Sequence, residues 1–76
     1  MSPRLPVVQA KDLVRVAQKL GFVFDRQTGS HAVYYREADR ARVVIPMHAR
    51  KDVPPKTLKD IIEDLNVTIE EFRSLL

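Results

Sequence analysis

The absence of cysteine from a chain of only 76 residues is the feature that most limits how this protein can fold. A domain this small buries one modest core, and many such domains depend on disulfides or a bound metal for their stability. Neither a disulfide framework nor a cysteine-based metal site can form here. Hydrophobic residues make up 45% of the chain and charged residues 30%, which is a globular composition. We therefore predict one domain over residues 1–76, with residues 1–9 as an N-terminal extension, stabilised by packing alone or together with a partner.

Apolar residues recur at helical spacing in two segments of the sequence. A first helix is predicted over about residues 10–20, followed by Gly21 at the place of a C-cap glycine. A second helix is predicted to start at the pair Pro54-Pro55 and to stop near Asn66. The apolar stripes of both helices are expected in the core and consist of Leu13, Val16, Ala17, Leu20, Leu58, Ile61, Ile62 and Leu65.

A third, short helix is predicted near the C-terminus. Thr68 and Glu71 form a capping-box pattern, in which each side chain bonds the backbone N–H of the other residue. Val67 and Phe72 stand at the two positions of a hydrophobic staple, which fixes how the chain enters a helix. Both patterns indicate that this helix starts directly after Thr68.

Three short strands are predicted between the first two helices. They are rich in aromatic and β-branched residues and are separated by polar runs, residues 25–30 and 37–41, that we interpret as turns. Such short links favour an antiparallel sheet, and the whole order predicts a two-layer α+β domain: helix, three-stranded antiparallel sheet, helix, short helix. One sheet face should meet the helices and the other solvent or a ligand. The predicted strands are residues 22–24, 31–36 and 42–45, with Phe22, Phe24, Val43 or Val44, and Ile45 in the core.

Charge is distributed unevenly along the sequence. Residues 1–59 hold 12 basic and 5 acidic side chains, a net charge of +7, whereas residues 60–76 hold five acidic side chains and one basic. This asymmetry agrees with a basic face for a polyanion and a different role for the C-terminal region. Lys11, Arg15 and Lys19 follow one another at i, i+4 and i+8 and form one stripe on the first predicted helix. Such a stripe is usually a solvated face, so phosphate binding by these three cations is a hypothesis.

The sequence argues against a membrane span, a signal peptide, a zinc site and a nucleotide-binding loop. No stretch approaches the roughly 20 apolar residues that span a bilayer, and residues 1–6 lack the apolar core of a signal peptide, so the cytoplasm is the expected location. Two histidines without cysteine cannot complete a zinc site unless carboxylates join them. The two glycines, Gly21 and Gly29, do not make a nucleotide-binding loop. We expect no cofactor and no metal.

His31 is the best candidate for a catalytic residue. Imidazole is the side chain whose unperturbed pKa, about 6.5, lets it take or give a proton near neutrality. His31 follows Gly29-Ser30, a predicted turn whose backbone amides and hydroxyl suit a phosphate. In RNA, a histidine can remove the 2′-hydroxyl proton so that the sugar oxygen attacks the adjacent phosphorus, while Lys or Arg stabilises the developing charge. From these residues alone, a single strand histidine is more often structural, and both interpretations stay open.

Four segments, in their order and spacing, resemble the HicA family of bacterial and archaeal toxins. The resemblance spans roughly residues 10–75, nearly the whole chain. No single motif carries it. The segments are Leu-Gly-Phe at 20–22, Gly-Ser-His at 29–31, Val-Ile-Pro-Met-His at 44–48 and Thr-Leu-Lys-Asp-Ile-Ile at 57–62.

This resemblance implies a fold similar to the double-stranded-RNA-binding domain and a type II toxin-antitoxin function. It implies a metal-independent endoribonuclease that cuts messenger RNA and is neutralised by a HicB-type antitoxin. The family's catalytic histidine falls on His31. Two positions depart from the family pattern: Lys56 stands where members commonly show glycine, and Ala32 where many carry a polar residue or histidine. We expect the alanine to weaken activity.

Other residues gain interest once RNA is the expected substrate. Gly29 and Ser30 are predicted to contact a phosphate, and Arg50 and Lys51 suit either phosphate contacts or a merely solvated loop. Tyr34 and Tyr35 point to opposite sheet faces, so one packs under the helices and the other, which we take to be Tyr35, is free to stack on a base.

His48 has two interpretations. It is either a second proton carrier or a residue whose hydrogen bond fixes its loop, and we favour the structural role.

Two other functions remain as alternatives to the nuclease. A non-catalytic RNA-binding module would have the same basic surface without turnover, and cleavage of a labelled RNA without added metal separates the two. A protein-binding module would dock a partner without RNA, and salt-dependent RNA binding would exclude it.

Overall fold

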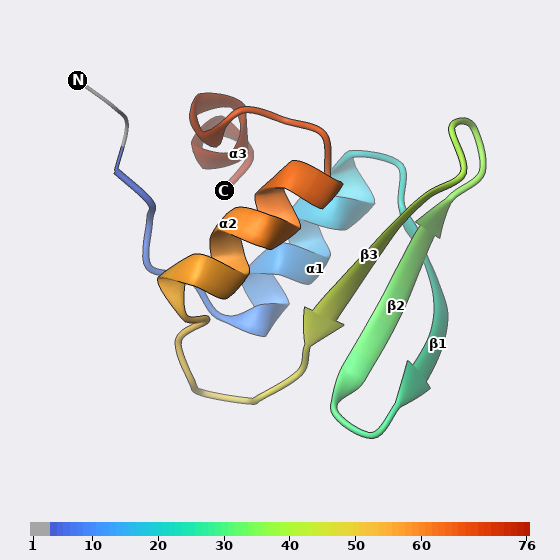
Figure 1. Ribbon diagram of the computed structural model, residues 1–76, viewed down its shortest axis with the longest axis horizontal. Helices are drawn as coiled ribbons and strands as arrows, with labels where there is room; N and C mark the ends of the chain where they lie inside the picture. The colour runs from blue at the N-terminus through green and yellow to red at the C-terminus, as the bar shows by residue number, and fades with distance from the viewer. Residues whose placement is uncertain (1–3) are drawn as a thin grey trace.

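The computed structural model describes residues 4–76, and its elements follow the order helix, three strands, helix, helix (Figure 1). This order and the α+β class confirm the prediction. Residues 1–3 of the expected N-terminal extension lie outside the described residues. The elements are α1 (Ala10–Lys19), β1 (Val23–Thr28), β2 (His31–Arg36), β3 (Ala41–Pro46), α2 (Pro55–Asp64) and α3 (Ile69–Leu75).

The helix ends follow from local capping. The backbone N–H of Gln9 donates to the Asp12 carboxylate at 2.9 Å, which fixes the start of α1, and Gly21 after its end has the positive φ, 89°, that a glycine adopts without strain. Both bonds of the capping box predicted for α3 are present at 3.0 Å: the Thr68 N–H donates to the Glu71 carboxylate, and the Glu71 N–H donates to the Thr68 hydroxyl. The predicted start of α3 is therefore confirmed.

The sheet has the order β1-β2-β3 and is antiparallel throughout. Side chains of a strand alternate between faces, so the pairing of β2 with β3 decides which residues share a face. Ala32 opposite Ile45 and Tyr34 opposite Val43 face the helices and are buried. The other face, which we call the open face, carries the pairs His31 with Pro46, Val33 with Val44, and Tyr35 with Arg42.

The register settles which valine of β3 is in the core. Val43 is fully buried, whereas Val44 lies on the open face and is 45% exposed.

Three sequence predictions about β1 and α1 need correction. β1 extends to Thr28, so the turn is Gly29-Ser30 alone rather than residues 25–30. Phe24 is not in the core: it is 54% exposed, and its ring meets that of Tyr34 edge to face at 5.7 Å. The reason is that β1 is the sheet edge far from the helices, and all six of its residues are exposed. Leu20 is only partly buried at the edge of the core.

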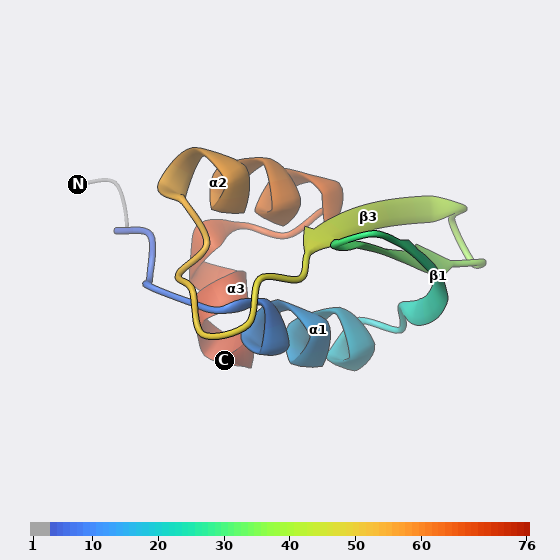
Figure 2. The same cartoon turned by 90° about the horizontal axis from the view of Figure 1, so that it is seen from below.

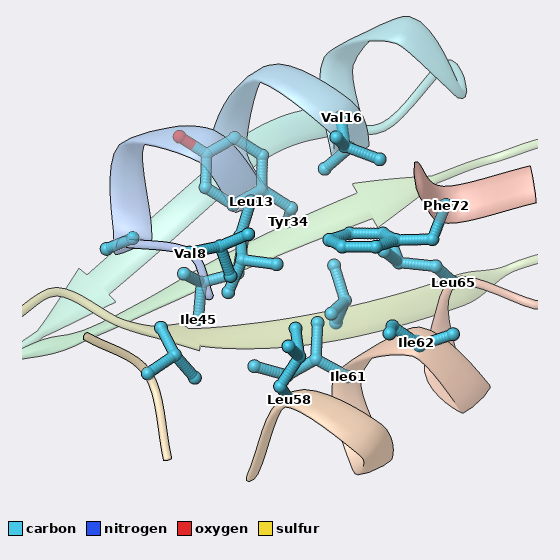
Figure 3. Close-up of a cluster of buried hydrophobic side chains, with 14 of the residues drawn as sticks. Val8, Leu13, Val16, Tyr34, Ile45, Leu58, Ile61, Ile62, Leu65 and Phe72 are labelled. Atoms are coloured by element: carbon cyan, nitrogen blue, oxygen red, sulfur yellow. The ribbon is translucent and has the colours of Figure 1, made fainter. Parts of the chain in front are cut away.

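The core lies where α1 and α2 meet β3, and α3 packs against α1. Figure 2 shows the sheet extending away from the helices, with β3 as the strand nearest to them, and both α1 and α2 contact β3. Figure 3 shows Leu58, Ile61 and Ile62 of α2 reaching towards β3 from the side opposite to Leu13 of α1. Phe72 of α3 is fully buried in the same cluster. The predicted apolar stripes of α1 and α2 thus form the core, apart from Leu20.

The segment before α1 is part of the fold. Val8 is 3% exposed, and its carbonyl accepts a hydrogen bond from the Val53 N–H at 2.8 Å. Gln9 and Asp52 form an isolated antiparallel bridge beside it. Within the described residues, the expected extension therefore ties the start of α1 to the loop before α2.

Arg36 links the end of α1 to the β2–β3 turn. It donates to the Leu20 carbonyl at 2.7 Å and to the Asp39 carboxylate at 2.8 and 2.9 Å, and its guanidinium lies 4.4 Å from the centre of the Phe22 ring. The hydrogen bonds from Arg36 to the Asp39 carboxylate hold the pKa of Asp39 below its ordinary value. One side chain thus joins three segments at the end of the sheet opposite to the Gly29-Ser30 turn.

Replacing Ile61 by alanine tests the core. Because Ile61 is 3% exposed, we expect Ile61→Ala to lower the free energy of unfolding by about 2 to 5 kcal/mol. Denaturant unfolding measures this difference. Val7→Ala, at a position 78% exposed, is the control and should change little. Equal effects of the two substitutions would contradict the core assignment.

Candidate active site

His31 is the first residue of β2 and lies at the end of the sheet next to the β1–β2 turn. It pairs with Thr28 of β1 and with Pro46 of β3, and its side chain is on the open face, exposed to solvent. Its place follows from alternation along β2, because Ala32 and Tyr34 must face the core. The backbone of His31 thus lies between β1 and β3, while its imidazole stays accessible.

The turn before His31 requires its glycine. Gly29 has a φ of 58° at the first of the two turn positions, the pattern of a type II′ hairpin turn. A Cβ added there would have no atom within 4 Å, so only the backbone conformation excludes other residues. The empty space beside Gly29 also leaves the turn open to a ligand.

A hydrogen bond connects this turn to the loop after β3. The Ser30 carbonyl accepts from the backbone N–H of Met47, directly after Pro46, which has no N–H to give. The loop that begins at Met47 is therefore fixed beside the residue that precedes His31. This contact carries His48, 17 positions further along the chain, to the same end of the sheet as His31.

The two histidines line one cavity of about 360 Å³, which we call the histidine cavity. His31 comes from β2, His48 from the loop after β3, and Thr57 from the first turn of α2. Val44, Pro46 and Pro54 complete the wall. The sequence analysis did not select Thr57, although this residue begins the last segment of the family resemblance. It interpreted the two prolines only as the boundaries of a strand and a helix.

His48 forms a turn through its backbone rather than its ring. The His48 carbonyl accepts a hydrogen bond from the Lys51 N–H at 3.2 Å, which closes the turn His48–Lys51. The imidazole is on an exposed residue and lines the histidine cavity. The structure thus places the ring next to the space in front of His31.

The stripe Lys11, Arg15 and Lys19 is exposed, as predicted, but its members have different surroundings. Arg15 pairs with Asp12 at 3.0 Å, and the Lys19 ammonium donates to the Leu75 carbonyl of α3 at 2.7 Å. Lys11 instead lines a second cavity that Arg50 and His48 also line. The structure brings only Lys11 of this stripe towards the histidines.

Lys51 and Tyr35, which the sequence also suggested as RNA contacts, lie at different distances along the molecule from the histidine cavity. Lys51 borders a third cavity together with His48 and Pro46. Tyr35 is half-buried on the open face, with the Arg42 guanidinium 5.3 Å from its ring centre, and does not line the histidine cavity. Tyr34 packs in the core, as the alternation requires. Tyr35 therefore lies further along the same face, separated from His31 by Val33.

Ala32 follows His31 in the sequence but points away from it. It is 1% exposed and packs in the core opposite Ile45. A polar side chain at this position would enter the core rather than the histidine cavity. The burial of Ala32 gives no physical reason for weaker activity in this chain.

Residues 4–76 contain no group of three or more histidine or acidic side chains placed to hold a metal ion. Within the same part of the chain, no helix is long and apolar enough to cross a membrane.

A family model describing the HicA toxin of bacterial toxin-antitoxin systems matches residues 10–67. The chain belongs to the HicA toxin family. The match confirms the resemblance found in the sequence, and it includes every residue of the histidine cavity. As a HicA toxin the protein has an antitoxin as its partner. No curated protein sequence matches the chain. The matched range of this HicA chain ends before α3, although Phe72 of that helix is fully buried in the core.

Substitutions at Gly29 test the turn that positions His31 in this HicA chain. We expect Gly29→Ala to destabilise the fold by about 1 to 2 kcal/mol, because a Cβ disfavours the left-handed conformation. Gly29→Asn should cost less, since asparagine tolerates that conformation. Denaturant unfolding of the two variants gives the comparison. Equal stability of the alanine variant and the parent would show that the turn does not need a positive φ.

Proposed function

We propose that this HicA toxin is an endoribonuclease that cuts messenger RNA, with His31 as its catalytic residue. The observation that carries the proposal is the exposed His31 ring in the wall of a cavity that a second histidine also lines. The match to a toxin family agrees with this activity, because destruction of messenger RNA stops protein synthesis.

The proposed reaction uses the RNA's own 2′-hydroxyl as nucleophile. The neutral imidazole of His31 takes the 2′-hydroxyl proton, and the sugar oxygen attacks the adjacent phosphorus. The bond from phosphorus to the 5′-oxygen of the next nucleotide breaks, and that oxygen leaves as a hydroxyl with a proton given by a water or a lysine. The products are a 2′,3′-cyclic phosphate and a 5′-hydroxyl end. No step needs a metal ion, so we propose a metal-independent reaction.

The residues around His31 suit the binding of the phosphate. Gly29, which is exposed, and Ser30, which is half-buried, form a hairpin end whose N–H and hydroxyl groups are donors for phosphate oxygens. Lys11, Arg50 and Lys51 add positive charge around the loop that holds His48. Arg15 and Lys19 are further phosphate ligands in this proposal only if RNA displaces the contacts with Asp12 and Leu75.

Replacing His31 by alanine tests the proposal. Positioned acid-base groups typically contribute about 100-fold to 10,000-fold in rate, so we expect His31→Ala to lower RNA cleavage by that factor and to abolish toxicity. Folding and RNA affinity should stay nearly unchanged, because the exposed ring adds little to the core. Thermal melting, RNA binding and cleavage of a labelled RNA, with and without EDTA, measure these quantities. Thr28→Ala, at the exposed residue paired with His31 in β1, is the control.

The outcomes separate the alternatives. A His31→Ala protein that still cuts at the parent rate refutes the catalytic assignment, and one that melts much lower indicates a structural histidine. A wild-type chain that binds RNA in a salt-dependent manner without cutting it is an RNA-binding module. Loss of wild-type cleavage in EDTA contradicts the metal-independent reaction.

We also propose that a HicB-type antitoxin neutralises this toxin by covering the histidine cavity. The cavity is open to solvent, so a protein seated on it blocks RNA without any change in the fold. In the complex we expect acylation of His31 by diethyl pyrocarbonate, followed by mass spectrometry, to be much slower than in the free toxin. An unchanged rate of His31 modification in a stable, inactive complex would contradict direct occlusion.

A further inference from the structure

A second cavity also has His48 in its wall and differs from the histidine cavity in its other lining residues. Its volume is about 250 Å³. Residues at the start of α1 and in the turn after β3 line it, and the apolar ones among them are Ala10, Met47 and Ala49. His48 lines both cavities. His48 is therefore the residue at which the two cavities adjoin.

Two cations accompany the apolar wall. Lys11 and Arg50 line the second cavity, and the ion pairs found within residues 4–76 leave both without a carboxylate partner. Gln9 adds a side-chain amide, which can both donate and accept hydrogen bonds. Apolar contact area, one amide and two free cations in one cavity match a ligand that has a flat apolar ring, polar ring edges and negative charge.

Arg50 adopts a backbone conformation that glycine or asparagine would adopt more easily. Its φ is 63° at the third position of the turn His48–Lys51. Arg40 has a similar φ, 55°, in the β2–β3 turn, so this geometry alone does not mark a site. The two arginines differ in their surroundings, because Arg50 lines a cavity next to His48 and Arg40 lines none of the three cavities described.

We propose that the second cavity binds a nucleobase of the RNA, next to the phosphate at which the 2′-oxygen attacks. Ala10, Met47 and Ala49 contact the faces of the base, Gln9 contacts its edge, and Lys11 and Arg50 contact the neighbouring phosphates or stack on the ring. Single-stranded RNA is recognised in this way when an unstacked base is turned outward. The inference rests on the proposed function, because it takes the histidine cavity as the place of cleavage.

The test compares two kinds of variant with a matched control: one fills the second cavity, and the other removes a positive charge from it. All carry His31→Ala so that RNA is bound without being cut. Ala49→Leu fills part of the second cavity with a larger side chain and does not change the charge. Arg50→Gly removes a cation and relieves the positive φ, and Arg40→Gly does the same in the β2–β3 turn, away from the cavity. Thermal melting confirms that each variant folds.

Affinity is measured by fluorescence anisotropy with two labelled RNA oligonucleotides. Both contain the bond that the wild-type protein cuts, and the second has abasic nucleotides on either side of it. We expect Ala49→Leu and Arg50→Gly to weaken binding of the intact RNA about tenfold, since base stacking typically contributes about 1 to 3 kcal/mol. The effect of Ala49→Leu should vanish on the abasic RNA, and Arg40→Gly should bind both RNAs like the parent.

The contrary results are distinct from one another. An Ala49→Leu protein that binds the intact RNA like the parent, or loses the same factor on the abasic RNA, overturns the base site while wild-type cleavage still supports the nuclease. Equal losses of RNA affinity for Arg50→Gly and Arg40→Gly would show that only the net charge of the protein matters, and they would also overturn the base site. Unchanged RNA affinity with weaker antitoxin binding assigns the cavity to the protein partner. A wild-type chain that neither binds nor cuts RNA fails the proposed function itself.

Discussion

The pairing of β2 with β3 is the constraint on which the rest of this structure depends. Two cross-strand pairs, Ala32 with Ile45 and Tyr34 with Val43, must face the helices, because they supply the sheet's part of the only core among the described residues. A shift of one residue would turn the whole strand over, so it would bury the His31 face and expose Tyr34. The accessibility of His31 is therefore a consequence of core packing at its neighbours, and the two cannot change independently.

The candidate site combines segments that are distant in the sequence. His31 starts β2, His48 follows β3, and Thr57 belongs to the first turn of α2. The hydrogen bond from the Met47 N–H to the Ser30 carbonyl holds the first two segments together, and the bond from the Val53 N–H to the Val8 carbonyl fixes the far end of the same loop. Between these two bonds the loop borders all three cavities, which makes its conformation decisive for what the site can bind.

The helices support the strands unequally, and this affects the site. β3 packs against both α1 and α2, whereas β1 has no buried residue and depends on its hydrogen bonds to β2 and on a few surface contacts such as that between Phe24 and Tyr34. Strands with little buried surface open most easily in the native state. The hairpin end that carries Gly29 and Ser30 thus joins a firmly packed strand to a weakly packed one, while His31 itself belongs to the firmly packed strand β2.

The sequence by itself determined the helices, the number of strands and the capping box of α3, because these depend on spacing and capping within a few residues. It also singled out His31, through the Gly-Ser-His segment and its family resemblance. Only the tertiary structure decided that Val43 rather than Val44 is buried, that Phe24 is exposed, and that Lys19 binds α3 instead of standing free beside Lys11. It alone brought His48 into the wall in front of His31. The physical reason is that strand register and helix packing are set by contacts between distant segments, which no local pattern records.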